Sequence, residues 1–342
     1  MTDLRDRRLE KYIEKRVSVV TPVFNGEDSL ASMLDSVLNQ TYPHIEMILV
    51  DDGSGDQTAA IAKSYRESFS ERGYLYRIVR AEHKNASAAI NGGLPYVTGE
   101  YLIWPDSDDI LEPDSVKKRV EFLENNPQYQ CVRSLAYYFD KLTGERRAPD
   151  EREGDLSKEE LFWDILEFRT FVCCGCYMLR TEKFFDIFPQ RHIPEYNVGQ
   201  NFQMLLPFMY RYRCPTIREQ LYGVCVREGS HSRVKLTQRE EEQKYREYEE
   251  LVDDIVLICH IGDKKSRNRI IYWKARRRYA LAIKYGGRTR RKEALCLMKK
   301  CGRLSFYILL KDFLWIRLEN TWLIKRLYPL YRRILKKDAG MK

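Results

Sequence analysis

The sequence feature that most constrains this chain is an apolar stretch that ends in three aspartates. Residues 101–104 are Tyr-Leu-Ile-Trp, and Asp106, Asp108 and Asp109 follow after a proline. In an extended segment Asp106 and Asp108 alternate, so both carboxylates can point the same way from a strand end. Two hard oxygen ligands suit Mg²⁺ or Mn²⁺, which bridge protein carboxylates to substrate phosphates. The alternative is an acidic start to the helix predicted after Pro113.

The chain before these aspartates predicts alternating strands and helices. Runs rich in β-branched and aromatic residues predict strands over 17–24, 45–50, 74–79 and 101–104. Apolar residues at three- and four-residue spacing predict helices over 30–38, after Asp56, over 86–97 and after Pro113. This order predicts an α/β fold with a Rossmann-like, mostly parallel sheet flanked by helices.

Polar residues stand where three of these strands end. Asn25, the pair Asp51 and Asp52, and the pair Asp106 and Asp108 all occupy such positions. Ligands of parallel sheets bind beyond the carboxyl ends of the strands, so we expect a site there. The chain has neither a G-x-G-x-x-G nor a G-x-x-x-x-G-K-[ST] pattern, so a metal is expected to hold any phosphate.

Cysteine usage and hydropathy predict a cytoplasmic protein. The nine cysteines include one cluster, Cys173, Cys174 and Cys176, without a second C-x-x-C motif or a histidine at ligand spacing, which favours buried, reduced thiols over disulfides or a metal site. No charge-free apolar run approaches the length that a membrane-spanning helix needs. Residues 1–16 are charged and lack the apolar core of a signal peptide.

Four segments carry a more specific pattern. Residues 17–25 are Val-Ser-Val-Val-Thr-Pro-Val-Phe-Asn, 51–58 are Asp-Asp-Gly-Ser-Gly-Asp-Gln-Thr, 99–101 are Gly-Glu-Tyr and 106–109 are Asp-Ser-Asp-Asp. In order and spacing these segments resemble the motifs of the family 2 glycosyltransferases, which have the GT-A fold. The resemblance implies inverting transfer of a sugar from a nucleotide-sugar donor, usually a UDP-sugar, with a divalent metal on the diphosphate.

Carried over position by position, the resemblance implies a donor site and a metal site. The donor-binding residues would be Pro22, Val23, Asn25, Glu27, Asp51, Asp52, Lys84, Asn85, Asp106 and Ser107. Asp52, with Asp51, would accept a hydrogen bond from uracil, and Asp106 and Asp108 would bind Mn²⁺ or Mg²⁺. Asn85 and Ile90 replace a glycine and an arginine of the family pattern, which leaves the choice of base and sugar open.

The acceptor side is expected in the second half of the chain. Family members open a helix there with a Glu-Asp pair that supplies the catalytic carboxylate, but this chain has Gln200 and Asn201. An amide has no usable basicity near neutral pH. Either Glu195 or a neighbouring aspartate acts as the base, or the acceptor needs little deprotonation, or the protein only binds the donor. Asp109, Gln200 and Asn201 are expected to face the acceptor.

A third metal ligand is expected near the end of this domain. Residues 221–232 resemble the end of the GT-A domain, where some relatives bind the metal through a histidine. His231 would take that role here, and its imidazole would favour Mn²⁺ over Mg²⁺. The alternative is a loop histidine without a partner.

The C-terminal part of the chain is strongly basic. Residues 263–342 hold 25 Lys and Arg against 5 Asp and Glu, a local charge of about +20, and alternate these with aromatic residues. We expect residues 1–235 to form the GT-A domain and 236–342 a helical extension that contacts an anionic membrane surface. The alternative is a solvated helical tail. Nucleic acid is not expected as a partner, because no recognition motif accompanies the charge.

Together these features predict sugar transfer to a saccharide or lipid-linked saccharide acceptor during cell-surface polysaccharide assembly. The protein is expected in the cytoplasm, at the inner face of the cell membrane. Two alternatives remain open. A nucleotidyltransferase could share the sheet and the metal, but it would need a basic, glycine-rich loop where residues 25–28 are acidic. A catalytically silent binding or scaffold subunit would account for Gln200 and Asn201.

Overall fold

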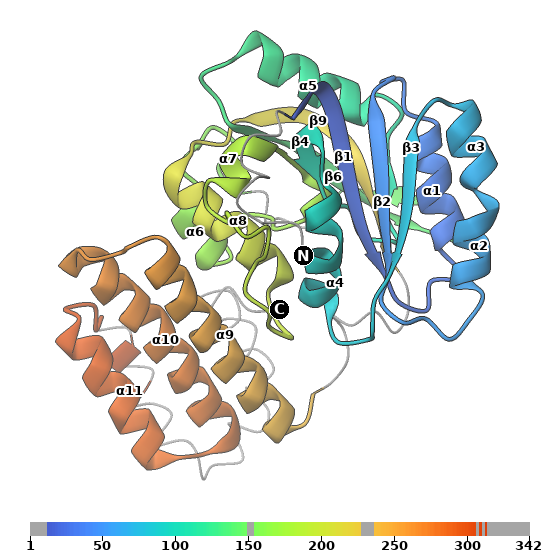
Figure 1. Cartoon of the computed structure of the whole chain (residues 1–342). Helices are drawn as coiled ribbons and strands as arrows, with labels where there is room; N and C mark the ends of the chain where they lie inside the picture. The colour runs from blue at the N-terminus through green and yellow to red at the C-terminus, as the bar shows by residue number, and fades with distance from the viewer. Residues whose placement is uncertain (1–11, 149–153, 227–235, 306–307, 310–311, 313–342) are drawn as a thin grey trace. The chain divides into compact units, whose positions relative to one another are not determined.

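The computed structural model describes residues 12–148, 154–226, 236–305, 308–309 and 312 (Figure 1). The chain divides into two compact units. The first comprises residues 1–165 and 170–234, and the second comprises residues 166–169 and 235–342. Residues 166–169 lie inside the predicted 1–235 domain in sequence but belong to the second unit.

A mostly parallel sheet organises the first unit. In spatial order its main path is β3 (Leu75–Arg80), β2 (Ile45–Asp51), β1 (Ile13–Val23), β4 (Gly99–Ile103), β8 (Tyr177–Arg180), β6 (Cys131–Asp140), β9 (Thr216–Val226) and β5 (Ile110–Leu111), and β7 (Arg146–Arg147) pairs with β6. The strands β3, β2, β1 and β4 are mutually parallel, whereas β8 and β5 are antiparallel to their neighbours. The predicted fold class and the four predicted N-terminal strands are confirmed.

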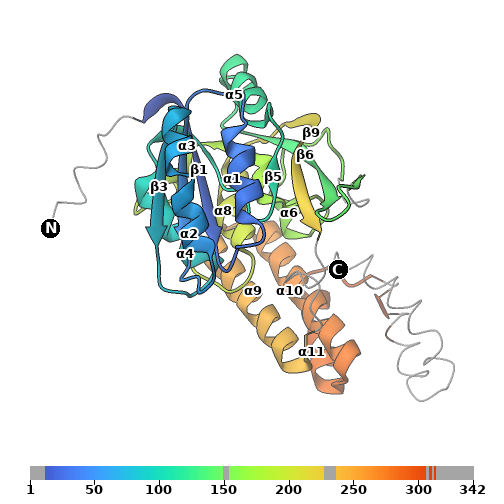
Figure 2. The same cartoon turned by 90° about the vertical axis from the view of Figure 1, so that its right-hand side faces the viewer.

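Helices cover both faces of the parallel strands. The helices α1 (Leu30–Leu38), α2 (Thr58–Ser64) and α3 (Arg66–Glu71) lie over one face, and α4 (Ala86–Gly93) with the short η2 (Leu94–Tyr96) lies over the other (Figures 1 and 2). Because both faces are covered, every residue of β2 is buried. A central parallel strand of this kind is a continuous apolar run rather than an alternating one.

The register of these strands brings the predicted site residues to one edge of the sheet. Val23 pairs with Asp51, and Val19 pairs with Ile103. Since β1, β2 and β4 run in the same direction, the residues that follow each of them emerge at the same edge. That edge carries Asn25, Asp52 and Asp106.

The rest of the first unit is built around the second half of the sheet. The helix α5 (Ser115–Asn125) precedes β6, and α6 (Phe162–Leu166), η3 (Cys174–Cys176), α7 (Thr181–Phe185) and α8 (Gln200–Arg211) lie between β6 and β9 in sequence. The sequence over 129–139 predicts a strand, which the structure has as β6, and the apolar residues over 161–166 predict a helix, which the structure has as α6. The short strand β8 was not predicted, because four residues after a cysteine-rich turn carry too little pattern.

Three helices form the described part of the second unit. They are α9 (Gln238–Ile258), α10 (Lys264–Tyr285) and α11 (Arg288–Lys300), and they lie side by side (Figure 2). The apolar core between α10 and α11 consists of Ala275, Tyr279, Ile283, Ala294 and Met298. Within the part of the chain that the structure describes, no helix is both long and apolar enough to cross a membrane.

Residues 166–169 join the second unit through specific contacts with α10. Trp273 Nε1 donates to the Leu166 carbonyl at 2.7 Å, and Arg269 Nε donates to Glu167 at 2.5 Å. The guanidinium of Arg277 is buried and lies 3.6 Å from the ring centroid of Trp273 and 5.0 Å from that of Phe168. Cation–π contacts of this kind help to offset the cost of burying a charge.

The basic residues of α10 and α11 are partly neutralised by acidic residues of α9. Lys274 Nζ lies 2.6 Å from Asp253, Arg278 Nε donates to Glu249 at 2.8 Å, and Arg290 lies 2.8 Å from Glu242. Lys284 forms a further ion pair with Glu241. The local charge of about +20 from residue 263 onward therefore overstates the charge of this unit, because α9 lies before residue 263.

Candidate functional site

The loops after β1 and β2 hold each other in place. Asn25, with a left-handed φ of 49°, donates its backbone N–H to Ser54 Oγ at 3.0 Å and accepts Gly55 N–H through Oδ1 at 3.0 Å. Glu27 accepts the N–H of Gln57 at 3.1 Å. The predicted donor residues Asn25 and Glu27 thus cross-link the two loops, and these links pre-form this part of the site.

The two aspartates at the end of β2 have different surroundings. Asp51 is 1% exposed and accepts the N–H of Ser54 at 2.8 Å, which fixes the turn after the strand. Asp52 is 4% exposed and contacts the 83–84 loop: Oδ2 lies 2.9 Å from His83 Nδ1, and Oδ1 accepts the Lys84 N–H at 3.3 Å. Of the two, Asp52 is the one that contacts the predicted donor residue Lys84.

An aromatic pair borders Asp52 that the sequence did not single out. Phe24 stacks on His83 with ring centroids 3.8 Å apart and an interplanar angle of 16°. Phe24 is 44% exposed, so part of its ring remains accessible. The signal in the sequence was the histidine itself, which directly precedes the predicted donor residue Lys84.

The predicted donor residues at the end of β1 differ in accessibility. Val23 is buried, and Pro22 is partly exposed. Ser107, in the turn after β4, is also partly exposed. Asn85 caps α4 by accepting the Ala88 N–H at 2.9 Å, so its carbonyl has a structural task in addition to any contact with a donor.

Carboxylates gather after β4. Burial, followed by the neighbouring Asp108, raises the pKa of Asp106 to about 6, and a hydrogen bond with Cys174 opposes that rise. Burial and the charges of Asp106 and Asp108 raise the pKa of Asp109 well above its usual range. Mutual repulsion among such closely spaced, partly or fully buried carboxylates is what a bound divalent cation relieves.

Asp109 is built into the fold more deeply than its neighbours. It is 4% exposed, and its Oδ1 accepts the Cys225 N–H from β9 at 2.8 Å. Tyr222 contributes a hydrogen bond to the same carboxylate, and its hydroxyl also accepts the Asp106 N–H at 3.1 Å. The acceptor-side role of Asp109 stays a prediction, and the structure gives this residue the task of joining the 106–109 turn to β9.

The donor set fits a divalent metal in its chemistry. Asp106 and Asp108 supply hard carboxylate oxygens, and a cation would relieve the part that the charge of Asp108 adds to the burial-raised pKa of Asp106. Within the described residues, however, no group of three His, Cys, Asp or Glu side chains is arranged to hold a metal. The third predicted ligand, His231, lies outside the described residues. The metal assignment therefore stays a prediction.

The amides that replace the expected carboxylates stand at the start of α8. Gly199 precedes the helix with a left-handed φ of 64°. Asn201 accepts the Trp104 Nε1–H at 3.3 Å and donates to the Val172 carbonyl at 3.2 Å. The buried Nε2 of Gln200 has no hydrogen-bond partner among the described residues. Asn201 thus joins three segments of the fold, while the amide nitrogen of Gln200 is left with hydrogen-bonding capacity.

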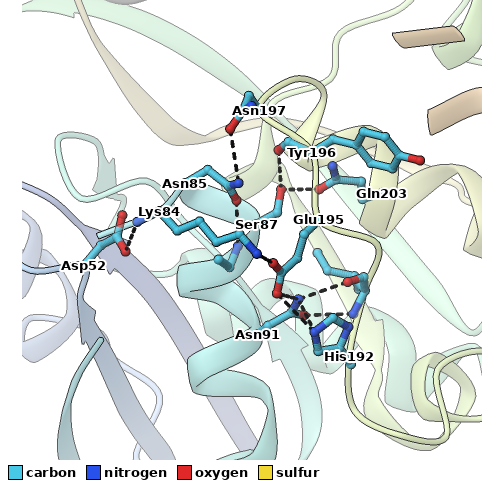
Figure 3. Close-up of polar contacts among 12 residues, drawn as sticks. Asp52, Lys84, Asn85, Ser87, Asn91, His192, Glu195, Tyr196, Asn197 and Gln203 are labelled. Atoms are coloured by element: carbon cyan, nitrogen blue, oxygen red, sulfur yellow. Dashed lines mark hydrogen bonds and ion pairs between the residues drawn. The ribbon is translucent and has the colours of Figure 1, made fainter. Parts of the chain in front are cut away.

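Glu195 lies in the loop that leads to α8 and is held on both carboxylate oxygens (Figure 3). Lys84 donates to Oε2, while Asn91 donates to Oε1 at 3.2 Å and His192 Nε2 lies 3.1 Å from Oε1. The hydrogen bond from Lys84 is the main cause that lowers the pKa of Glu195. The structure therefore brings Glu195 and Lys84 together, and makes Glu195 a weaker base than an unpaired carboxylate.

Comparison with known proteins identifies the family. Residues 18–188, half of the chain, match the model of glycosyl transferase family 2. The chain belongs to glycosyltransferase family 2. The matched segment includes the strand-end residues of the first unit. Membership of this family favours glycosyl transfer over nucleotidyl transfer.

Curated relatives of this chain include proteins named as glycosyltransferases. EpsE of Bacillus subtilis, described by name as a glycosyltransferase, is 31% identical over 213 residues, which cover 61% of this chain and 72% of EpsE. TuaG of the same species, described as a teichuronic acid biosynthesis glycosyltransferase, is 39% identical over 167 residues, which cover 49% of this chain and 63% of TuaG. The matched segment thus extends over most, but not all, of these relatives.

Solved structures share the fold over a longer span. TarS of S. aureus, crystallised with UDP-GlcNAc, superimposes with a TM-score of 0.60 at 16% identity and covers 84% of this chain and 80% of its own. The mannosyltransferase PcManGT of Pyrobaculum calidifontis, in complex with GDP-Man and Mn²⁺, has a TM-score of 0.56 at 16% identity and covers 98% and 90%. The predicted GT-A architecture of this family 2 protein is confirmed.

Proposed function

We propose that this family 2 glycosyltransferase moves a sugar, with inversion, from a nucleotide-sugar donor to a hydroxyl of a saccharide or lipid-linked saccharide. The favoured donor is a UDP-sugar, and the proposed setting is cell-surface polysaccharide assembly. The observation that carries the proposal is the position of Asp52 after β2 and of Asp106 and Asp108 after β4, the two parallel strands that flank β1. The nucleotide-sugars named for TarS and PcManGT support the class of donor.

The two carboxylate positions have complementary tasks in this proposal. Asp52 would accept an N–H of the nucleobase, beside the exposed ring of Phe24. Asp106 and Asp108, with His231, would hold Mn²⁺ or Mg²⁺, which when bound would offset the negative charge of the diphosphate. The cross-linked loops at Asn25 and Glu27 would keep this arrangement in place before the donor arrives.

The transfer itself requires a proton acceptor. The acceptor hydroxyl oxygen would form a bond to the anomeric carbon as the bond to the diphosphate oxygen breaks, and the hydroxyl proton would pass to a carboxylate. Glu195 stays the proposed base, although its lowered pKa requires that Lys84 first release it. The buried Nε2 of Gln200 would donate to an acceptor oxygen, a contact that orients the acceptor without removing its proton.

A second candidate function follows from the same residues. Asn201 is engaged by Trp104 and Val172, and Glu195 by Lys84, so one of the two amides and the nearest carboxylate are occupied by structural contacts. A protein that binds a nucleotide-sugar without transferring it would be compatible with this arrangement. Catalysis distinguishes the two candidates.

Donor hydrolysis without an acceptor tests the proposal. Full-length protein would be incubated with UDP-GlcNAc, UDP-glucose or GDP-mannose in the presence of Mn²⁺, and nucleotide release would be measured. We expect release with at least one donor, its loss with EDTA, and its loss in Asp108→Asn. Donor binding without release would favour the silent binding subunit, and neither binding nor release would contradict both candidates.

The location of the enzyme is a separate part of the proposal. We propose that it works in the cytoplasm, at the inner face of the cell membrane, with the basic second unit facing anionic lipid. Support comes from the cations of α11 that remain exposed, among them Lys292, Lys299 and Lys300. The ion pairs between α9 and α10 reduce the number of charges available for such a contact.

A further inference from the structure

The segment 191–199 connects α7 to α8 and follows the surface of α4. It carries Glu195 and ends at Gly199, directly before the amides of α8. Figure 3 shows side chains of α4 and of the 191–199 segment pointing toward one another. The position of the start of α8, and with it the proposed acceptor side, depends on how this segment is fixed.

Buried contacts with α4 fix one side of the segment. Asn91 of α4 accepts the Ile193 N–H at 2.8 Å and donates to the Ile193 carbonyl at 3.0 Å, as a neighbouring strand would. Ser87 lies 3.2 Å from the Tyr196 carbonyl and also hydrogen-bonds Gln203 of α8. Asn91, Ser87 and Gln203 are at most 8% exposed. Because solvent does not compete for these contacts, we expect them to persist whether or not a ligand is bound.

The contacts that residues 84 and 85 make with the 191–199 segment are exposed to solvent. The Lys84 side chain is 61% exposed and that of Glu195 is 21% exposed, so water can replace their ion pair. Two other exposed contacts lie near them: Asn85 Nδ2 donates to Asn197 Oδ1 at 3.2 Å, and His192 Nε2 lies 3.1 Å from Glu195 Oε1. These contacts can form or break without disturbing the buried side.

Lys84 also touches the proposed nucleobase site. Its backbone N–H donates to Asp52 Oδ1, while its side chain donates to Glu195. The other oxygen of Asp52 lies against His83, so both oxygens hold the 83–84 loop. A change in the position of the Asp52 carboxylate therefore moves the backbone from which the Lys84 side chain extends.

We propose that Lys84 and Glu195 are positioning residues that link nucleotide binding at Asp52 to the 191–199 segment and the start of α8. Nucleotide bound at Asp52 fixes the 83–84 loop, the fixed loop strengthens the ion pair between Lys84 and Glu195, and the ion pair orders the segment that places Gln200. The acceptor side thus becomes ordered after the donor side, and Lys84 releases Glu195 to act as the base only after an acceptor has bound. This inference rests on the proposed function, because it takes a nucleotide as the ligand of Asp52.

Hydrogen exchange with and without nucleotide tests the link. Amide exchange in peptides covering 191–203 would be followed in full-length protein, with and without UDP and Mn²⁺ at concentrations that saturate each variant. In the wild type we expect the nucleotide to slow exchange in this segment about tenfold, a common size for coupling between sites. In Lys84→Met and in Glu195→Gln the nucleotide-dependent slowing should fall below about twofold.

Two controls separate coupling from simple support of the fold. Lys84→Arg keeps the charge and should keep the slowing, and Asn197→Ala removes only the neighbouring contact with Asn85 and should keep it as well. A merely structural role for Glu195 would speed exchange equally with and without UDP. Equal nucleotide-dependent slowing in Glu195→Gln and wild type, or no slowing in wild type that binds UDP, would overturn the link alone. Failure of the wild type to bind UDP or GDP contradicts the proposed function as well.

Discussion

Single residues set the electrostatics of the strand-end site. The raised pKa of Asp106, about 6, and that of Asp109, well above its usual range, have the same main cause, burial, to which neighbouring aspartate charges add. Asp108→Asn keeps the shape of the side chain but removes one of these charges. We expect this variant to lose Mn²⁺-dependent UDP binding while its melting temperature without ligand stays close to that of the wild type. Calorimetric titration of UDP with Mn²⁺ measures the loss, and Asp140→Ala, at a partly exposed aspartate that ends β6, serves as the control. Unchanged affinity in Asp108→Asn would rule out Asp108 as a metal ligand.

A second residue-scale prediction concerns the packing of Gly175 against Tyr222, the side chain that supports the aspartate turn. A Cβ added at Gly175 would lie 2.0 Å from the ring of Tyr222, which is fully buried and holds the Asp106 backbone. Gly175→Ala should therefore destabilise the protein by about 1–3 kcal/mol, the usual cost of overpacking a core. Gly262→Ala, where the nearest atom is 3.9 Å away, should cost less than about 0.5 kcal/mol. Urea denaturation of both variants measures the difference, and equal stabilities would show that the Tyr222 ring can move aside.

At the scale of elements, the start of α8 is defined by an amide that both accepts and donates. Asn201→Asp would keep the oxygen that faces Trp104 but would remove the donor to the Val172 carbonyl. We expect a loss of about 1–3 kcal/mol at pH 8, because a buried carbonyl and a carboxylate would then face each other. The loss should shrink toward pH 4, because a protonated Asp carboxyl can donate to the Val172 carbonyl. This contact favours the protonated form and so raises the pKa of the new carboxyl in the folded state. The stability that the contact adds is therefore present at low pH and is lost as the pH rises. Denaturation midpoints at the two pH values check the sign, and a loss that does not depend on pH would contradict it.

At the scale of the whole molecule, charge is distributed unevenly between and within the two units. The second unit is basic, but α9 neutralises part of α10, and the exposed cations Lys292, Lys299 and Lys300 remain on α11. Replacing these three by Gln should reduce sedimentation with phosphatidylglycerol vesicles, because each cation near an anionic surface contributes about 1 kcal/mol. Wild-type protein should sediment far less with phosphatidylcholine vesicles. A control that replaces Lys63, Lys141 and Arg218 of the first unit removes the same net charge and should bind as wild type does. Equal sedimentation of the two triple variants would assign the contact to charge in general or to other residues.

Local sequence was sufficient to predict the first half of the sheet and the edge of the sheet at which the candidate site residues stand. Consecutive apolar residues indicate a buried parallel strand, and such strands order their carboxyl ends along one edge, so Asp52 and Asp106 could be placed at the same edge from the sequence. The family motifs added the class of ligand expected there. Contacts with residues distant in sequence were not predictable in this way, and His83 next to Asp52 is one of them.

Sequence alone thus determined which chemistry stands at the strand ends, and the tertiary structure decided what each group can do there. The loss of a carboxylate at Asn201 was visible in the sequence, but its contacts with Trp104 and Val172 follow from the packing of three distant segments. The lowered pKa of Glu195 likewise requires Lys84, which is 111 residues away. The physical reason is that periodicity reports burial and direction along one element, whereas hydrogen bonds and pKa values depend on which other elements pack against it.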